Sequence, residues 1–256
     1  VIREDVSGLD RSEQALVVSI IQELPLEYRV DLYDIVRDGL DQLEPRLDMY
    51  YSRSAELAED LVNGEHFDEG LDLIDSLLTI RLEAEPEGRN EDIMGSYYLT
   101  SLFDEGTLER LVRNRPNQTI ELFEEKLNDA ARARAEDRGK EVDDLQFFHQ
   151  FAVSNFSIEE DDRNKPFELF VGFLRETVDT WFETTDVEDQ QERITEYLDS
   201  NVTLRGFGFY LLREHSEDHS DLVGEELLDE ENYRDIRLKK EFKLLLKHGF
   251  SSIPDD

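Results

Sequence analysis

The chain has 256 residues, no cysteine and a formal net charge of −36, from 64 acidic and 28 basic side chains. These totals exclude disulfides, thiolate metal sites and cysteine nucleophiles, and they leave no electrostatic drive for binding nucleic acid or anionic membranes. Because 38% of the residues are hydrophobic and 10% are aromatic, the sequence predicts a folded protein with a carboxylate-rich surface rather than a disordered acidic tail.

The basic residues are mostly arginine, with 21 Arg against 7 Lys. Acid excess with scarce lysine resembles the proteins of salt-in halophiles, whose cytoplasm screens the repulsion between carboxylates. The sequence contains neither an apolar run of membrane-spanning length nor a signal-peptide pattern, so we expect a cytoplasmic location. Because the chain opens at Val1 rather than Met and stops soon after a helical pattern, we expect an excerpt of a longer protein or a trimmed product.

Helical periodicity dominates the first third of the chain. Apolar residues recur at helical spacing from Leu16 to Leu24, and Pro25 ends that run. Further patterns cover residues 30–43, 47–61 and 67–82. Asn63 and Gly64 separate the last two patterns and predict a left-handed C-cap. The patterns on either side of this turn predict a helical hairpin that resembles a tetratricopeptide unit.

The segment "EPEGRNEDIMG" is the clearest break in the periodicity, because it is rich in proline, glycine and charge. It marks a candidate sub-boundary at residues 84–95 within one helical-repeat domain that spans residues 1–256. Predicted helices follow at residues 97–103, 108–112, 116–135, 145–156, 167–182, 187–198, 204–214, 222–228 and 233–247. The predicted fold class is therefore all-α, with antiparallel helical hairpins stacked as a curved α-solenoid of degenerate TPR/HEAT-like repeats.

The stretch "NVTLRGFGFYL" contains Gly206 and Gly208 and could be taken for a phosphate loop. A dinucleotide fingerprint needs a third glycine at position 211, where this chain has Leu211, and a strand before the glycines. We interpret the glycines as points of close helix packing. The β-forming residues around them leave a strand as the alternative.

His215 and His219 are four residues apart, the spacing at which two imidazoles on a helix can face one metal ion. The zinc-protease pattern requires a glutamate at position 216, which is Ser216 here, and no third ligand is indicated. The pair is thus a weak metal candidate. The alternative is a solvated turn in which Asp218 or Ser220 caps the next helix.

The stretch "RDIRLKKEFKLLLKHGF" is basic in an acidic protein and holds four of the seven lysines. Its basic side chains near one helical face are the predicted partner-binding residues: Arg237, Lys240, Lys243 and Lys247. Its apolar side chains fall on the other face: Leu238, Phe242, Leu245 and Leu246. The basic face suits an acidic partner or a phosphate. The alternative is an intramolecular role, complementing the helix dipole and the acidic surface.

A smaller basic cluster lies just before the helix predicted at 116–135. Arg110, Arg113 and Arg115 precede its N-terminus, where backbone N–H groups favour an anion. The cluster is a second, weaker candidate for anion binding.

Residues 204–250 carry a family resemblance. An arginine-led aromatic helix, "LRGFGFYLLREHSEDHSDL", is followed by a separator and by "IRLKKEFKLLLKHGFSSI". This arrangement resembles the degenerate helical-repeat arms of large STAND/NACHT-type NTPases, many of which act in prokaryotic antiviral defence. The resemblance implies a repeat arm that recognises a foreign protein or holds an attached ATPase inactive. The chain has no Gly-Lys-Ser/Thr loop, so no Walker residues are assigned.

The sequence therefore predicts a non-catalytic helical-repeat scaffold. Its partner would be a protein or other domains of the same chain, without direct nucleic-acid or membrane binding and without a cofactor. A free-standing α-helical adaptor is the alternative function. A helical metal-dependent hydrolase using His215 and His219 is the less favoured one.

Overall fold

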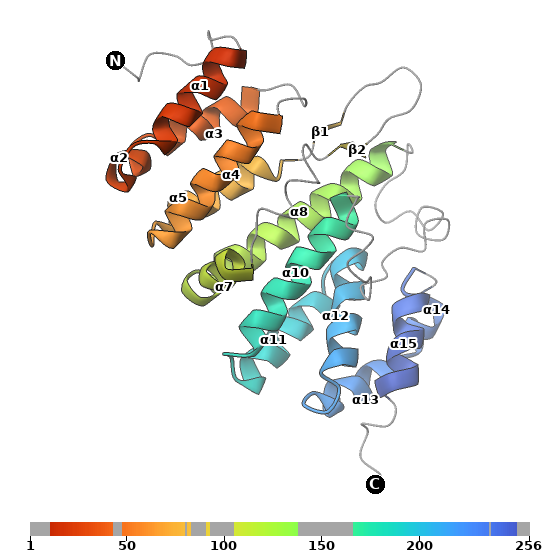
Figure 1. Cartoon of the computed structure of the whole chain (residues 1–256). Helices are drawn as coiled ribbons and strands as arrows, with labels where there is room; N and C mark the ends of the chain where they lie inside the picture. Colours follow the sequence, from red (N-terminus) through yellow and green to blue (C-terminus); the bar gives the residue numbers. More distant parts are fainter. Residues whose placement is uncertain are drawn as a thin grey trace. The chain divides into compact units, whose positions relative to one another are not determined.

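The computed structural model describes residues 11–42, 48–79, 81–82, 91–92, 105–137, 166–235 and 237–249. Across these residues the chain is helical apart from one pair of two-residue strands (Figure 1), which confirms the all-α prediction. The helices of the first half are α1 (Arg11–Gln22), α2 (Leu26–Val30), α3 (Tyr33–Gln42), α4 (Asp48–Asn63), α5 (Phe67–Leu77), α7 (Glu105–Asn114) and α8 (Pro116–Asp137). Those of the second half are α10 (Pro166–Phe182), α11 (Val187–Leu198), α12 (Val202–Glu214), α13 (Ser220–Leu228), α14 (Glu230–Arg234) and α15 (Lys239–Gly249). No helix among these is long and apolar enough to cross a membrane.

The two short strands follow α5. β1 (Arg81–Leu82) pairs antiparallel with β2 (Glu91–Asp92). The helix predicted over 67–82 is therefore too long, because α5 ends at Leu77. Most of the candidate sub-boundary at 84–95, and the helices predicted at 97–103 and 145–156, lie outside the described residues.

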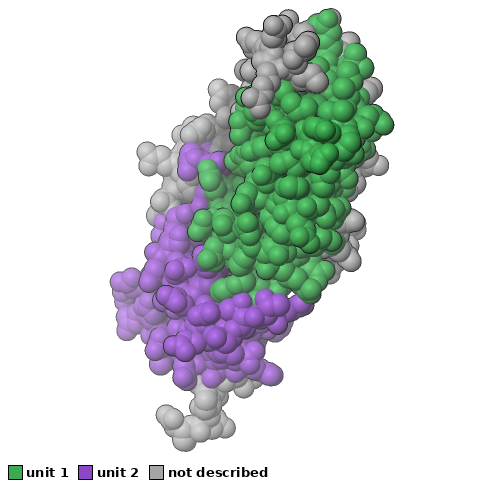
Figure 2. All heavy atoms as spheres, turned by 90° about the vertical axis from the view of Figure 1, so that its left-hand side faces the viewer, with its two compact units in different colours: residues 1–127, 163–181 green, residues 128–162, 182–256 purple. Residues whose placement is uncertain are grey.

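The chain divides into two compact units, coloured separately in Figure 2. Unit 1 comprises residues 1–127 and 163–181, and unit 2 comprises residues 128–162 and 182–256. The boundaries therefore fall inside α8 and at the end of α10. The prediction of one repeat domain with a sub-boundary at 84–95 stays a prediction.

In unit 1, α4 packs along α5 and forms the hairpin predicted from the sequence. Small side chains on α4 allow the close approach, because Ser54 and Ala55 are fully buried. A Cβ added at Gly70 on α5 would lie 2.7 Å from Val62 Cγ2 and 3.4 Å from the carbonyl oxygen of Ala58. The glycine is therefore required by helix contact rather than by backbone conformation.

The turn after α4 is a Schellman motif whose left-handed residue is Glu65, not Gly64. The His66 N–H donates to the Leu61 carbonyl at 2.9 Å, and the Glu65 N–H donates to the Val62 carbonyl at 3.1 Å. Glu65 has φ 67°. The C-cap predicted at Asn63-Gly64 is thus displaced by one residue. A Cβ on Gly64 would require the partly exposed Leu26 side chain to move, because it would lie 2.1 Å from Leu26 Cδ2.

Helix α1 turns a different face to the core than its periodicity suggested. Val18 and Ile21 are fully buried, whereas Leu16 and Ile20 are 59% and 46% exposed. The phase was ambiguous because "ALVVSII" is apolar at nearly every position. The helix is fixed on α4 by the Gln22 side-chain amide, which donates to the Arg53 carbonyl at 2.7 Å.

Helix α12 lies at the centre of unit 2, and its side chains are buried almost all round. Asn201 caps its N-terminus by accepting hydrogen bonds from Thr203 N at 3.0 Å and Leu204 N at 3.2 Å. Gly208 faces α11, where an added Cβ would lie 3.1 Å from Leu198 Cδ2 and 3.3 Å from Leu198 N. This supports the close-packing interpretation of Gly208, and the alternative of a strand over "NVTLRGFGFYL" is wrong.

The pattern at 233–247 was predicted as a single helix, but the chain breaks between α14 and α15. The Asp235 carboxylate accepts a hydrogen bond from the Arg237 backbone N–H at 3.0 Å. Such a bond to the residue two positions on is typical of a turn that competes with helix formation. The break lets α15 begin at Lys239 with a new direction.

Candidate functional site

The outward face of α15 carries an unbroken lysine strip. Lys239, Lys243 and Lys247 are four residues apart and therefore lie on one side of the helix, with Lys240 beside them. All four side chains are exposed. Among the described residues none forms an ion pair or hydrogen bond with any of these four amines. We call these four residues the lysine face.

Sequence reasoning missed Lys239 and placed Arg237 in this surface. The structure instead holds Arg237 against Asp235, with Nε at 2.9 Å and Nη2 at 2.7 Å from the carboxylate oxygens. Burial alone would raise the pKa of Asp235, but the hydrogen bonds from Arg237 hold that pKa below its ordinary value. Arg237 therefore serves the turn before α15, and we leave it out of the lysine face.

The opposite side of α15 is anchored on α12. Phe242 and Leu245 are buried, and the Phe242 ring centroid lies 5.7 Å from that of Phe209 on α12. Glu241 is also buried and pairs with Arg213 of α12 at 3.4 Å. These contacts fix the rotation of α15 about its axis, and that rotation turns the lysine face to solvent.

An apolar edge borders the lysine face. Leu246 is 37% exposed, although the sequence pattern assigned it to the buried side, and it lies one turn from Phe242. Tyr233 of α14 is 58% exposed and packs its ring at 4.9 Å from the Phe242 ring. The surface therefore offers ammonium groups and, beside them, two partly exposed apolar side chains.

A shallow groove of about 370 Å³ lies between α5 and α8 in unit 1. Each helix contributes a stripe with the same i, i+3, i+4, i+7 spacing. The stripe of α5 is Asp68, Leu71, Asp72 and Asp75, and that of α8 is Gln118, Glu121, Leu122 and Glu125. The groove thus has five carboxylates in total, three from α5 and two from α8. Each helix also contributes one leucine. We call it the acidic groove, and nothing in the sequence analysis predicted it.

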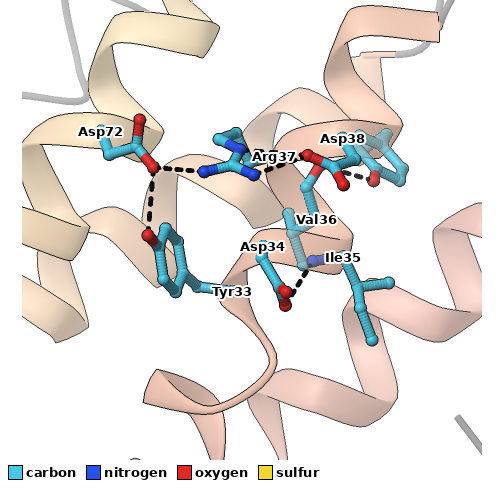
Figure 3. A network of polar contacts seen from close by, with 8 residues as sticks. Tyr33, Asp34, Ile35, Val36, Arg37, Asp38 and Asp72 are labelled. Atoms are coloured by element: carbon cyan, nitrogen blue, oxygen red, sulfur yellow. Dashed lines mark hydrogen bonds and ion pairs between the residues drawn. The ribbon is translucent and has the colours of Figure 1, made fainter. Parts of the chain in front are cut away.

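The α5 carboxylates of the acidic groove are already paired within unit 1. Asp72 accepts from Arg37 at 2.7 Å and from the Tyr33 hydroxyl at 3.1 Å, and Arg37 also reaches Asp38 (Figure 3). Asp75 pairs with Lys126. These contacts tie α3 and α8 to α5 and neutralise part of the groove.

The third α5 carboxylate of the groove, Asp68, accepts a hydrogen bond from Arg115 Nε at 2.6 Å, and this hydrogen bond lowers the pKa of Asp68. Arg113 pairs with Glu109, and Arg110 donates to the Asn63 carbonyl at 3.3 Å. The arginines predicted as an anion site are therefore each bound to an acceptor of the protein. Glu121 and Glu125 on α8 have no ion-pair partner among the described residues, and they leave the groove net negative.

His215 and His219 do not lie in a solvated turn. His219 is 3% exposed, and the Phe182 ring lies 4.8 Å from the His215 ring and 6.4 Å from the His219 ring. Burial and the neighbouring His215 lower the pKa of His219, while Asp218 acts in the opposite sense.

The helix after the histidines begins without the predicted cap. His219 itself occupies the N-cap of α13 without a side-chain hydrogen bond, so neither Asp218 nor Ser220 caps this helix. Among the described residues no group of three or more His, Asp or Glu side chains is placed to hold a metal ion. The histidine pair packs against an aromatic ring, and its metal role stays a prediction.

Comparisons with known proteins do not assign this chain to a family. No family model matches the sequence. Searches of curated proteins and of solved structures likewise found no match.

Proposed function

We propose that this chain is a non-catalytic helical scaffold that binds an acidic protein partner through the lysine face of α15. The observation that carries the proposal is the set of four exposed lysines that no described residue pairs, in a chain of net charge −36. In such a protein a basic strip is surrounded by carboxylates. Because none of those in the described part of the chain pairs with these lysines, the strip favours an external acidic ligand.

The apolar edge narrows the partner to a segment with both acidic and apolar side chains. Leu246 and Tyr233 flank the lysines, and their partial exposure provides area that a purely polyanionic ligand could not cover. An amphipathic acidic helix presents both kinds of side chain on adjacent faces. Contacts of the apolar edge would add affinity, while the lysines would add steering and orientation.

The wider architecture of the proposal is a stack of helical hairpins in the manner of TPR or HEAT repeats. The close pairs α4 with α5 and α11 with α12 support it. The resemblance of residues 204–250 to STAND/NACHT-type arms supports an extension in which the surface regulates an attached NTPase or senses a foreign protein. A Gly-Lys-Ser/Thr loop encoded beside this segment would favour that extension over a free-standing adaptor.

The binding test uses a fluorescein-labelled helical peptide with glutamates on one face and leucines on the adjacent face, followed by fluorescence anisotropy. The variant K240E/K243E/K247E should weaken binding by about tenfold or more, because each lost and reversed contact raises Kd. The control R53E/R113E/R234E makes the same change in net charge at exposed arginines outside the lysine face. Equal loss in both variants, or no binding by the parent chain, would contradict the proposal.

A further inference from the structure

The lysine face and the acidic groove match one another in charge and in spacing. We propose that the acidic partner of α15 is a second copy of this chain, which receives the lysine face in its groove between α5 and α8. The inference rests on the proposed function, because it uses the same surface of α15. It adds the identity of the occupant and predicts head-to-tail assembly.

The groove has the form needed to receive a helix. Its two stripes repeat at i, i+3, i+4 and i+7, so each runs along one side of its helix for two turns. Leu71 and Leu122 lie within the stripes, between carboxylates. Apolar residues flanked by acids on two neighbouring helices form the kind of groove that takes an amphipathic basic helix.

The match between the lysine face and the acidic groove depends on which groove carboxylates already have a partner within the chain. On α5 the carboxylates already face Arg115, Arg37 and Lys126. On α8 the carboxylates of Glu121 and Glu125, four residues apart, have no ion-pair partner among the described residues. Lys239, Lys243 and Lys247 repeat with the same four-residue interval on α15. A helix laid along α8 can therefore bring lysines opposite glutamates in consecutive turns.

The apolar edge fits the same arrangement. Leu246 precedes Lys247 and follows Lys243 by three residues, so it lies beside the lysine strip and toward the buried side of α15. With the lysines placed on Glu121 and Glu125, Leu246 is directed at the leucines of the groove. Leu122 is already buried, so the apolar area gained comes from Leu246 and the half-buried Leu71. Its burial would offset part of the cost of bringing two anionic chains together.

The contact would be heterologous, because the surface on one copy differs from the surface on the next. Such contacts produce rings when the rotation closes and open chains when it does not. The net charge of −36 per chain opposes assembly at low ionic strength. Added salt shortens the range of this repulsion from ~10 Å at about 0.1 M to ~3 Å at about 1 M. Self-association is therefore expected to emerge as potassium chloride is raised from the lower value.

Sedimentation velocity of the purified chain across that salt range is the test. The parent chain is expected to show concentration-dependent growth beyond the monomer. K240E/K243E/K247E and E121K/E125K should each weaken this association by about tenfold or more. The decisive samples are a mixture of the two variants and a single chain carrying all five reversals, because both restore opposite charges across the contact. Both are expected to associate, whereas R53E/R113E/R234E should behave as the parent.

Two results would overturn the inference. One is a parent chain that stays monomeric at every salt and protein concentration. The other is association that the single reversals abolish but the charge swap does not restore. If the monomeric chain still binds the acidic peptide through its lysines, a second copy of the chain is not the partner and the proposed function stands. If peptide binding is also insensitive to the lysine reversals, the proposed function fails as well.

Discussion

Arg213 on α12 and Glu241 on α15 form an ion pair at 3.4 Å whose side chains are only 8% and 3% exposed. The Arg213 guanidinium also lies 5.1 Å from the centroid of the Tyr210 ring. Arg213 also pairs with the more exposed Glu214 at 2.9 Å. The buried charge that depends on this contact is therefore Glu241, whose desolvation is uncompensated without Arg213. The pair therefore determines how α15 lies on α12, and with it the direction in which the lysine face points.

Breaking this pair should be costly, and replacing both partners should not. Arg213→Met is expected to destabilise the protein by about 3–5 kcal/mol, because it leaves the Glu241 carboxylate buried without its arginine, whereas the double variant R213M/E241L should be close to the parent. Urea unfolding followed by circular dichroism measures both. The exposed pair Arg234–Glu230, whose side chains are 75% and 81% exposed, is the control. Its loss should cost less than about 1 kcal/mol. Equal effects at the two sites would show that the Arg213–Glu241 pair is not desolvated.

The hairpin of α4 and α5 gives two predictions of opposite sign, one in its turn and one where its helices touch. Glu65→Gly should stabilise the protein by about 0.5–1 kcal/mol, because relief of the left-handed strain exceeds the added flexibility of the unfolded chain. Gly70→Ala should destabilise it by about 1–3 kcal/mol through overpacking against the fully buried Val62 side chain. Thermal melting of the two variants beside the parent checks both signs. Stabilisation by Gly70→Ala would mean that the close approach of Val62 to α5 is absent.

Stability should fall as the pH is lowered through the titration of His219. The pKa of His219 is lowered in the folded chain, so below about pH 6.5 the unfolded state binds the proton more readily. This contribution is fully present above that pH and is lost as the pH falls toward the folded pKa. The positive end of α13 also opposes an imidazolium at its N-cap.

The variant His219→Leu isolates this effect. Melting temperatures measured between about pH 5.5 and 7.5, above the ordinary titration of carboxylates, should depend less on pH in the variant than in the parent. Identical pH dependence in the two proteins would exclude His219 as the titrating group.

Salt should raise the melting temperature of the whole chain. With 64 acidic and 28 basic residues, repulsion between carboxylates loosens the fold until counter-ions screen it. Scanning calorimetry in a potassium chloride series measures the effect, and K240E/K243E/K247E should need more salt than the parent to reach the same melting temperature. A melting temperature insensitive to molar potassium chloride would rule out the halophile-like interpretation of the composition.

Much of the helical layout could be predicted from local signals. Pro116 and Pro166 begin α8 and α10 as expected from their fixed φ and missing N–H. Local signals predict the structure least well where tertiary packing decides which face of a helix is buried. Leu246 has the spacing of a core residue, yet it is partly exposed because α15 rests on α12 through Phe242 and Leu245.

The two candidate surfaces also differ in how far the sequence alone could predict them. The lysine face was visible in sequence because the lysines are rare and clustered. Arg237 pairs with Asp235 and therefore does not belong to the lysine face. This pairing depends on a turn inside a sequence pattern that predicts one continuous helix. The acidic groove could not be found by counting carboxylates, since 64 are present. The matching stripes of α5 and α8 would have been the signal, but only the fold shows that these two helices flank one groove.

The most direct test of the central claim is lysine acetylation, read by mass spectrometry, with and without the acidic amphipathic peptide. Lys126, which is buried and paired with Asp75, gives the level of a protected lysine in the same sample. Lys240, Lys243 and Lys247 are expected to react readily in the free chain. With peptide, their labelling should fall toward that of Lys126 with the same midpoint as the anisotropy titration. Unchanged labelling of these three lysines at saturating peptide would contradict the central claim.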